Sequence, residues 1–137
     1  MRTKLFFVIT MAFLASSCAK DLYVGYQTEG ANTSTIVLKP SKATEKSNVT
    51  INDNLIVDRK KVKSITIKNV PAGDYTVNFT CESGWYKEKI NAAIPVKSNG
   101  DGKTITKLIE VPPYSTGYWI YISACAIIPI ILIGVSF

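Results

Sequence analysis

Few side chains in this sequence have the chemistry of a catalytic centre. The 137 residues include no histidine, which removes the commonest general base and the commonest metal ligand. Asp53, Asp58 and Asp74 are acids that a glycosidase-like pair could use, but they lie in or beside turn-like segments, where short acids usually cap backbone groups. Neither a metal-spaced cluster nor a glycine-rich phosphate loop is found. The sequence therefore predicts a non-enzymatic protein without catalytic residues, metal or cofactor.

Cys81 is the thiol in the central part of the chain. It continues an alternation in which Tyr75, Val77 and Phe79 are apolar and the intervening residues are polar, so it should point to the buried side of a strand. A buried free cysteine usually fills space as a small apolar group. We therefore predict a structural role for Cys81; loss of an activity on a single cysteine or aspartate substitution would be needed to argue for an enzyme.

The first residues have the order of a secretory signal. Two positive charges in residues 1–4 precede an apolar run over residues 5–15, and Ser16-Ser17-Cys18 follows. Small residues before a cysteine resemble the lipobox of bacterial lipoproteins, in which the thiol is acylated and the cysteine becomes the new N-terminus. The alternative is an ordinary signal peptide that ends near a cysteine. The resemblance implies that Cys18 is a lipid-modified anchor in a bacterial cell envelope.

A second membrane-length segment lies at the other end of the sequence. Tyr118–Phe137 contains no charged residue, and twenty residues form a helix of about 30 Å, which matches the hydrocarbon core of a bilayer. We predict a transmembrane helix kinked at Pro129, because a proline disfavours the alternative of a buried central strand. Aromatic residues cluster where an interfacial belt should lie: Tyr114, Tyr118, Trp119 and Tyr121.

Small residues in this segment offer a route to a partner. Ser123, Ala124, Cys125 and Ala126 form a narrow patch through which another helix could approach closely. The segment could therefore dock on an integral membrane protein or serve only as a second anchor in membrane lipid, and both interpretations stay open.

The choice of membrane also stays open. Lys20-Asp21 resembles the lysine-plus-acid export tag behind the lipidated cysteine of surface lipoproteins in Bacteroidetes-like bacteria, which favours the outer membrane. A spanning apolar helix favours retention in the inner membrane, and it is the stronger signal because it involves twenty residues.

The charge distribution argues against nucleic acid as a partner. The formal net charge is +6, and removal of Arg2 and Lys4 with the signal leaves +4 spread along the chain. The one basic run, Arg59-Lys60-Lys61-Val62-Lys63, lies between two predicted strands and is expected to be a solvated turn.

Between the two terminal segments the hydrophobic period is two, which is typical of half-buried strands. Strands are predicted at Thr35–Leu38, Val49–Ile51, Leu55–Asp58, Ser64–Lys68, Tyr75–Cys81, Trp85–Ile90 and Thr104–Val111. Pro71-Ala72-Gly73-Asp74 has turn chemistry, so the strands on either side of it are predicted to form a hairpin. Short strands without helices between them predict an all-β fold, a small antiparallel β-sandwich.

One stretch of this region resembles a known family. The segment from Val49 to Ile90 is similar to a PEGA domain, a small β-sandwich related in shape to carboxypeptidase regulatory-like and transthyretin-like modules. Pro71, Gly73 and Tyr75 occupy its Pro-x-Gly turn and following aromatic position, and Gly84 precedes an aromatic pair as in that family. The resemblance implies an envelope-exposed binding or spacer domain without catalytic residues.

The aromatic pair Trp85-Tyr86 is the candidate binding surface. Adjacent residues of a strand point to opposite faces, so one ring should face outward, where it could stack on a sugar or anchor a partner protein. The alternative is that one ring is in the core and the other is half-covered by the stem of Lys87 or Lys89.

The predicted organisation has four parts. Residues 1–17 are a lipoprotein signal peptide, 18–31 a tether, 32–112 the PEGA-like β-sandwich and 113–137 the transmembrane segment. The expected function is a membrane-anchored envelope lipoprotein whose small module binds, or spaces, a protein or glycan. The alternative is an accessory or inhibitory subunit of a membrane complex that docks through the C-terminal helix.

Overall fold

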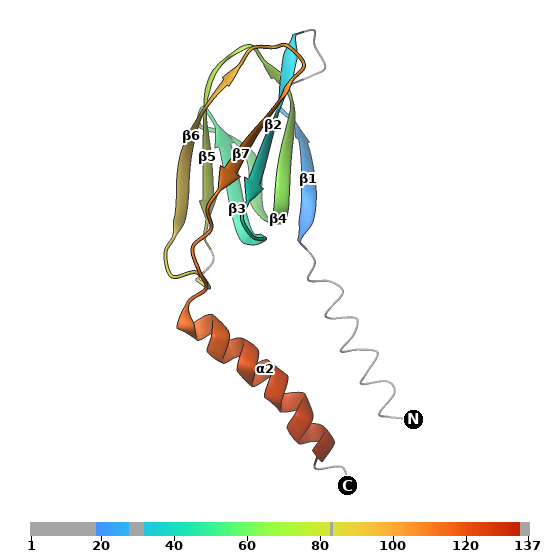
Figure 1. Cartoon of the computed structure of the whole chain (residues 1–137), viewed down its shortest axis with the longest axis vertical. Coiled ribbons are helices and arrows are strands. Elements are labelled where there is room, and N and C mark those ends of the chain that lie inside the picture. The colour runs from blue at the N-terminus through green and yellow to red at the C-terminus, as the bar shows by residue number, and fades with distance from the viewer. Residues whose placement is uncertain (1–18, 28–31, 83, 135–137) are drawn as a thin grey trace, which may run out of the picture.

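The fold is all-β apart from one helix, as predicted (Figure 1). The computed structural model describes residues 19–27, 32–82 and 84–134, with side chains up to residue 125. The predicted signal peptide and Cys18 lie outside the described residues, as do residues 135–137 of the predicted transmembrane helix. The elements are β1 (Lys20–Gly25), β2 (Thr33–Pro40), β3 (Thr44–Ile51), β4 (Asn54–Pro71), β5 (Gly73–Cys81), β6 (Ile90–Ser98), β7 (Thr104–Ile109) and α2 (Thr116–Gly134).

The long strand β4 joins two layers of the sheet. The strand order is β6-β5-β3-β4-β2-β7, and β1 also pairs with β4. The first half of β4 pairs with β3, and the second half pairs with β1 and β2. Only Ala72 separates the end of β4 from the start of β5, which pairs with β3. Strand β4 must therefore bend back, so that its second half packs across the core from β3 and β5.

The bend coincides with the basic run. Arg59 has a φ of 46°, and the β3–β4 pairing shifts register on both sides of Ser47, which is typical of a bulge that lets a strand change layers. The Oδ1 of Asn48 accepts a 2.7 Å hydrogen bond from the backbone N–H of Arg59. The prediction of two strands with a turn between them was wrong, because the bulge bends one strand without ending it.

The predicted hairpin at Pro71–Asp74 was also wrong. Both flanking segments are strands, but β5 pairs with β3 and β6, while the second half of β4 pairs with β1 and β2. The reason is burial, since each strand presents a fully apolar side to the core, Ile65 and Ile67 on one and Phe79 on the other. The turn at Ala72 therefore crosses from one layer to the next.

Two parallel pairings correct the antiparallel prediction. β1 runs parallel to β4, and β7 runs parallel to β2. Residues 20–25, predicted as part of a tether, form β1 because Leu22 and Val24 pack against the core while the residues between them are exposed. The two-residue hairpin of the fold is instead β3–β4, where Asn52 and Asp53 both have positive φ, as a tight hairpin turn requires.

One predicted strand is displaced along the sequence. Trp85–Ile90 was predicted, but the strand that pairs with β5 is β6, which begins at Ile90. β6 is an edge strand of the described sheet, which is where a strand tolerates a proline such as Pro95. The core between the layers consists of apolar side chains from β2 to β7: Ile36, Leu38, Val49, Ile51, Val57, Val62, Ile65, Ile67, Val70, Val77, Phe79, Cys81, Ile90, Val96 and Ile109.

Helix α2 follows β7 at one end of the β-domain (Figure 1). It contains no charged residue. In the part of the chain that the structure describes, no helix meets the length and apolarity needed to cross a membrane. The prediction of a transmembrane helix at Tyr118–Phe137 therefore gains no support from these residues.

Candidate functional site

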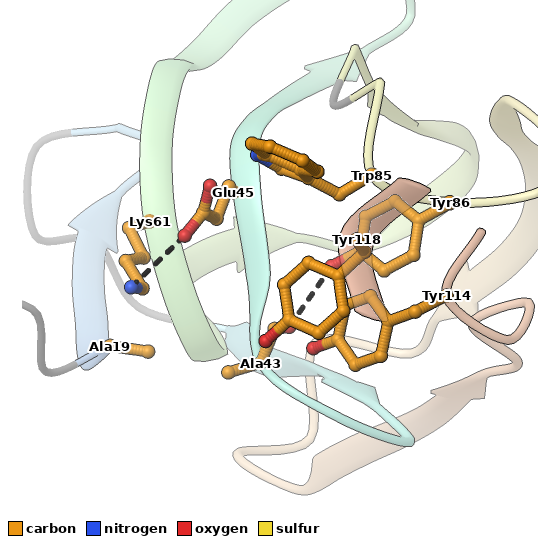
Figure 2. A pocket seen from close by; sticks show the side chains of 8 residues that line it. All are labelled: Ala19, Ala43, Glu45, Lys61, Trp85, Tyr86, Tyr114 and Tyr118. Atoms are coloured by element: carbon orange, nitrogen blue, oxygen red, sulfur yellow. Dashed lines mark hydrogen bonds and ion pairs between the residues drawn. The ribbon is translucent and has the colours of Figure 1, made fainter. Parts of the chain in front are cut away.

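A pocket lies where the β-domain meets α2, and we call it the junction pocket. Its volume is about 210 Å³. Its walls come from the residue before β1, from β3 and β4, from the loop after β5 and from the first turn of α2 (Figure 2). The lining residues are Ala19, Ala43, Glu45, Lys61, Trp85, Tyr86, Tyr114 and Tyr118.

Tyr86 is the buried aromatic residue of the junction pocket. Its side chain is 7% exposed, and its hydroxyl donates a 3.1 Å hydrogen bond to the carbonyl of Ala43. Burial, and next the neighbouring Tyr114, raise the pKa of the Tyr86 phenol well above its ordinary value. The phenol is therefore a hydrogen-bond donor held in its neutral form, which is poorly suited to act as a base.

Aromatic rings join the pocket to the helix, and we call the whole set the aromatic cluster. Tyr114 stacks on Tyr86 with a centroid distance of 5.3 Å and on Tyr118 at 4.1 Å. Trp85 lies edge-on to Tyr118, with a centroid distance of 5.7 Å, and tilted against Tyr121, at 5.1 Å. Such offset and edge-on pairs each stabilise by about 0.5–1.5 kcal/mol beyond their burial. The cluster consists of Trp85, Tyr86, Tyr114, Tyr118, Trp119 and Tyr121.

Backbone hydrogen bonds hold the cluster in place. The N–H of Ser115 donates to the carbonyl of Trp85 at 2.7 Å, and the N–H of Lys87 donates to the carbonyl of Pro113 at 3.1 Å. These bonds, with a bridge between Tyr86 and Tyr114, explain why residues 85–89 do not continue the sheet. Their backbone groups pair with the segment before α2 instead.

The two rings of the aromatic pair Trp85-Tyr86 differ in burial. Tyr86 is in the core, whereas Trp85 is 36% exposed and contacts the rings of Tyr118 and Tyr121. The pair thus matches the alternative in which one ring is in the core and the other is half-covered. The rings of Tyr118 and Tyr121 on α2 cover Trp85, where the sequence suggested the stem of Lys87 or Lys89. The cluster unites the two residue sets that the sequence suggested separately, the aromatic pair and the belt at the start of the helix.

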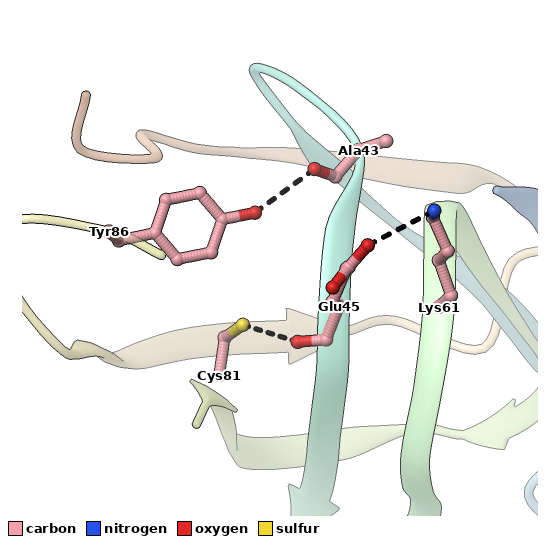
Figure 3. Close-up of polar contacts among 5 residues, drawn as sticks. All are labelled: Ala43, Glu45, Lys61, Cys81 and Tyr86. Carbon is pink, nitrogen blue, oxygen red and sulfur yellow. Dashed lines mark hydrogen bonds and ion pairs between the residues drawn. The ribbon is translucent and has the colours of Figure 1, made fainter. Parts of the chain in front are cut away.

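Glu45 and Lys61 are the charged residues that line the junction pocket, and Figure 3 shows their contact with each other. Lys61 Nζ lies 3.1 Å from Glu45 Oε1, and Lys42 Nζ lies 4.9 Å from the centre of the Tyr114 ring, in cation–π geometry. Cys81 is 2% exposed, and its thiol donates to the carbonyl of Glu45 at 2.6 Å. The prediction that Cys81 points inward is confirmed, and its thiol holds β3 to β5 beside the pocket.

The turn motif lies elsewhere. Pro71, Gly73 and Tyr75 lie at the opposite end of β5 from Cys81, and the Tyr75 ring packs edge-on against Tyr26 at 5.7 Å. An open depression beside Tyr75 is lined by Asp74, Thr76, Pro95, Val96, Lys97 and Lys107.

The three candidate acids lie on different elements. Asp53 lies in the β3–β4 turn, Asp58 precedes the bend of β4, and Asp74 lies at the start of β5. Asp53 and Asp74 are at the same end of the domain, because Asn52 and Thr76 are hydrogen-bonded to each other. Asp74 lines the depression beside Tyr75, which neither Asp53 nor Asp58 lines.

Replacement of Tyr86 by phenylalanine is expected to lower the free energy of unfolding by about 1 kcal/mol at neutral pH, because it removes the bond to Ala43. The folded state holds the phenol proton more tightly than the unfolded state, whose pKa is near 10.0. The stabilisation is therefore fully present below pH 10 and is lost as the pH rises through and beyond that value. Urea unfolding at neutral and alkaline pH measures both effects.

The matched control is Tyr23→Phe, since Tyr23 is 66% exposed and the change should stay within about 0.5 kcal/mol. An equal alkaline loss of stability in Tyr86→Phe and the native chain would contradict a buried, neutral Tyr86.

The junction pocket presents aromatic rings on one side and an ion pair on the other. Such walls suit contact with an apolar or ring-shaped group carrying polar substituents. No family model, curated protein or solved structure matches this chain. The residues that line the pocket are therefore the guide to its chemistry.

Proposed function

We propose that this chain is a non-enzymatic lipoprotein of a bacterial envelope, whose PEGA-like β-sandwich is a binding or spacer module held at a membrane. Cys18 provides the acyl anchor, and the apolar segment Tyr118–Phe137 provides the second. The observation that supports this proposal best is that Ala19 and Tyr118 line the same junction pocket. The start of β1 and the start of α2 thus lie at the same end of the β-domain (Figure 1).

The exposed side chains of α2 support the same proposal. Trp119 and Ile120 are 58% and 66% exposed, and Tyr121 and Ile122 are also open. Full burial of a large apolar side chain stabilises by about 1.5–3 kcal/mol. Lipid around the helix supplies that burial, and the aromatic rings at its start suit the interface between lipid and water.

The module itself binds or spaces a protein or glycan. The partly exposed Trp85 ring and the charged wall of the junction pocket are suited to a sugar ring or to a partner's polar surface. A non-enzymatic role agrees with the burial of the Cys81 thiol.

Membrane fractionation of anchor variants tests this proposal. The variants are Cys18→Ser, an exchange of residues 122–137 for a polar sequence, and both together. The exchange keeps Tyr118 and Tyr121 in contact with Trp85, so the junction stays intact. Each single variant should sediment with membranes after alkaline carbonate washing or be only partly released, and the double variant should be soluble. A native chain found in the soluble fraction, or a double variant that stays with the membranes, would refute anchoring by these two segments.

A second function is supported by a separate observation. Ser123, Ala124 and Cys125 are exposed on α2, and small exposed residues allow a second helix to pack closely. In this case the chain is an accessory subunit of a membrane complex, and the β-sandwich is a spacer.

Cross-linking in the native cells separates the two functions. The native chain is compared with a variant in which residues 122–137 are a generic apolar helix without small residues, and the captured proteins are identified by mass spectrometry. Capture of a discrete membrane protein by the native helix alone favours the subunit. Capture of the same envelope component by both chains favours the binding module.

A further inference from the structure

The bend of β4 places a group of cations beside the junction pocket. Arg59, Lys60 and Lys63 are exposed, and Lys61 lines the pocket. We call these four residues the basic corner. The bend has to carry them to this end of the domain, because Val62 is level with Thr44 of β3 and with Lys20 of β1. The basic run, which the sequence predicted to be a solvated turn, is thus part of a bent strand and lies at the end of the domain where α2 begins.

Other cations lie at the same end. Lys20 starts β1 next to the basic corner, and Lys42 lies over the Tyr114 ring. Some of the nearby carboxylates are already paired, since Glu45 contacts Lys61 and Asp21 accepts a 2.6 Å hydrogen bond from the Ser64 hydroxyl. Asp58 is exposed beside Arg59 and offsets one of its charges. Glu82, Glu88 and Glu110 are exposed at this end too, but so are Lys46, Lys87 and Lys89. The end of the domain therefore keeps an excess of positive charge, which the basic corner and Lys20 supply.

Exposed aromatic rings continue this surface onto the helix. Trp85 is the ring of the cluster that the β-domain exposes, and Trp119 and Tyr121 are exposed on α2. Amphipathic rings next to Lys and Arg side chains are the combination that suits the headgroup region of a bilayer, where the rings enter the interface and the cations meet phosphates.

We propose that the basic corner and the aromatic cluster together form a surface that binds the headgroups of anionic phospholipids. The inference rests on the proposed function, because anchoring brings this end to the membrane. Charge complementarity and the rings of α2 favour a lipid surface over a protein at this position. The contact fixes the orientation of the β-domain, so that the turn at Pro71 and the loop at Gly100 face away from the bilayer.

The test uses the full chain reconstituted in vesicles of phosphatidylcholine, with or without phosphatidylglycerol. Trp119→Phe leaves Trp85 as the sole tryptophan, and lipids spin-labelled at the headgroup report its distance from the surface by quenching. We expect stronger quenching of Trp85 in the anionic vesicles, reduced by high salt. The difference should be abolished in a triple variant that carries Arg59→Gln, Lys60→Gln and Lys63→Gln. Each basic residue near an anionic surface changes the ratio of bound to free orientations about fivefold, so the three together change it about a hundredfold.

A matched control removes three cations from the opposite half of the domain, by Lys68→Gln, Lys97→Gln and Lys103→Gln. This variant has the same net charge as the triple variant of the basic corner. Its Trp85 should nevertheless be quenched as strongly as in the Trp119→Phe chain with all its cations. Equal effects of the two triple variants would show that only net charge matters and would overturn the inference.

Flotation of the vesicles distinguishes a failure of membrane anchoring from a failure of the lipid-binding surface. If the chain floats with the vesicles but Trp85 is quenched equally weakly in neutral and anionic lipid, the lipid-binding surface is wrong and the anchoring stands. If the native chain does not float, anchoring and the surface both fail.

Discussion

Replacement of Phe79 by alanine is expected to lower the free energy of unfolding by about 3–5 kcal/mol. Phe79 is fully buried, and it is the largest such side chain. On β5 it is level with Val49 of β3 and Ala92 of β6, so its truncation leaves a cavity in the core between the two layers. Small domains have a total stability of about 5–15 kcal/mol, so this single change removes a large part of it.

Urea unfolding of the full chain in mild detergent, followed by tryptophan fluorescence, measures this loss. Phe79→Leu keeps most of the volume and should cost less than about 1.5 kcal/mol. Leu55→Ala, at an exposed position of β4, should change stability by no more than about 0.5 kcal/mol. If Phe79→Ala matched Leu55→Ala, the packing of the two layers described here would be wrong.

Gly100→Ala is expected to destabilise the domain by about 2–5 kcal/mol. Gly100 has a φ of +66°, where an L-residue costs about 1–2 kcal/mol. A Cβ there would lie 2.5 Å from the carbonyl oxygen of Asn32 and 3.2 Å from the Cβ of Ala72, and forced overpacking adds about 1–3 kcal/mol. The loop after β6 would have to move away from the loop before β2.

Gly102 provides an internal control for the Gly100 prediction. Its φ is +74°, but no heavy atom lies within 4 Å of the position of a Cβ. Gly102→Ala should therefore cost only the conformational term, about 1–2 kcal/mol. Thermal unfolding of the two variants measures the difference, at about 4–8 °C per kcal/mol for a domain of this size. Equal losses would contradict the close approach of Gly100 to Asn32.

Alternation in the sequence correctly predicted strands in the middle of the chain, such as Tyr75–Cys81, but it did not predict how the strands pair. Tyr75–Cys81 was correctly predicted as a strand with Cys81 inward, because alternation reports which side of a strand is buried. The same pattern does not indicate which strand will pair with it. The two segments around Ala72 face each other across the core, whereas a turn of the same composition usually joins neighbours.

The missed elements have identifiable causes. β1 has only six residues and follows directly on the signal-like segment, so Leu22 and Val24 were too few to define an alternation. β6 contains Ala92, Ala93 and Pro95, which lower strand propensity but are tolerated at an edge. The positive φ of Arg59 has no distinct sequence signal, and it is this bulge that places the basic corner.

The candidate site was predicted in pieces. The sequence suggested Trp85 and Tyr86 as a binding pair. It suggested an interfacial belt formed by Tyr114, Tyr118, Trp119 and Tyr121. Their union depends on the hydrogen bond between Ser115 and Trp85, a contact between segments thirty residues apart that no local pattern encodes. The aromatic cluster fixes the start of α2 against the β-domain.

Intact-mass analysis of the protein extracted from native membranes tests the proposal that the chain is a lipoprotein held at a membrane from one end of its β-domain. The predicted result is a chain that begins at Cys18, carries a thioether-linked diacylglycerol and retains the residues of α2. A mature chain recovered without lipid on Cys18, or a chain that still carries residues 1–17, would contradict the proposal.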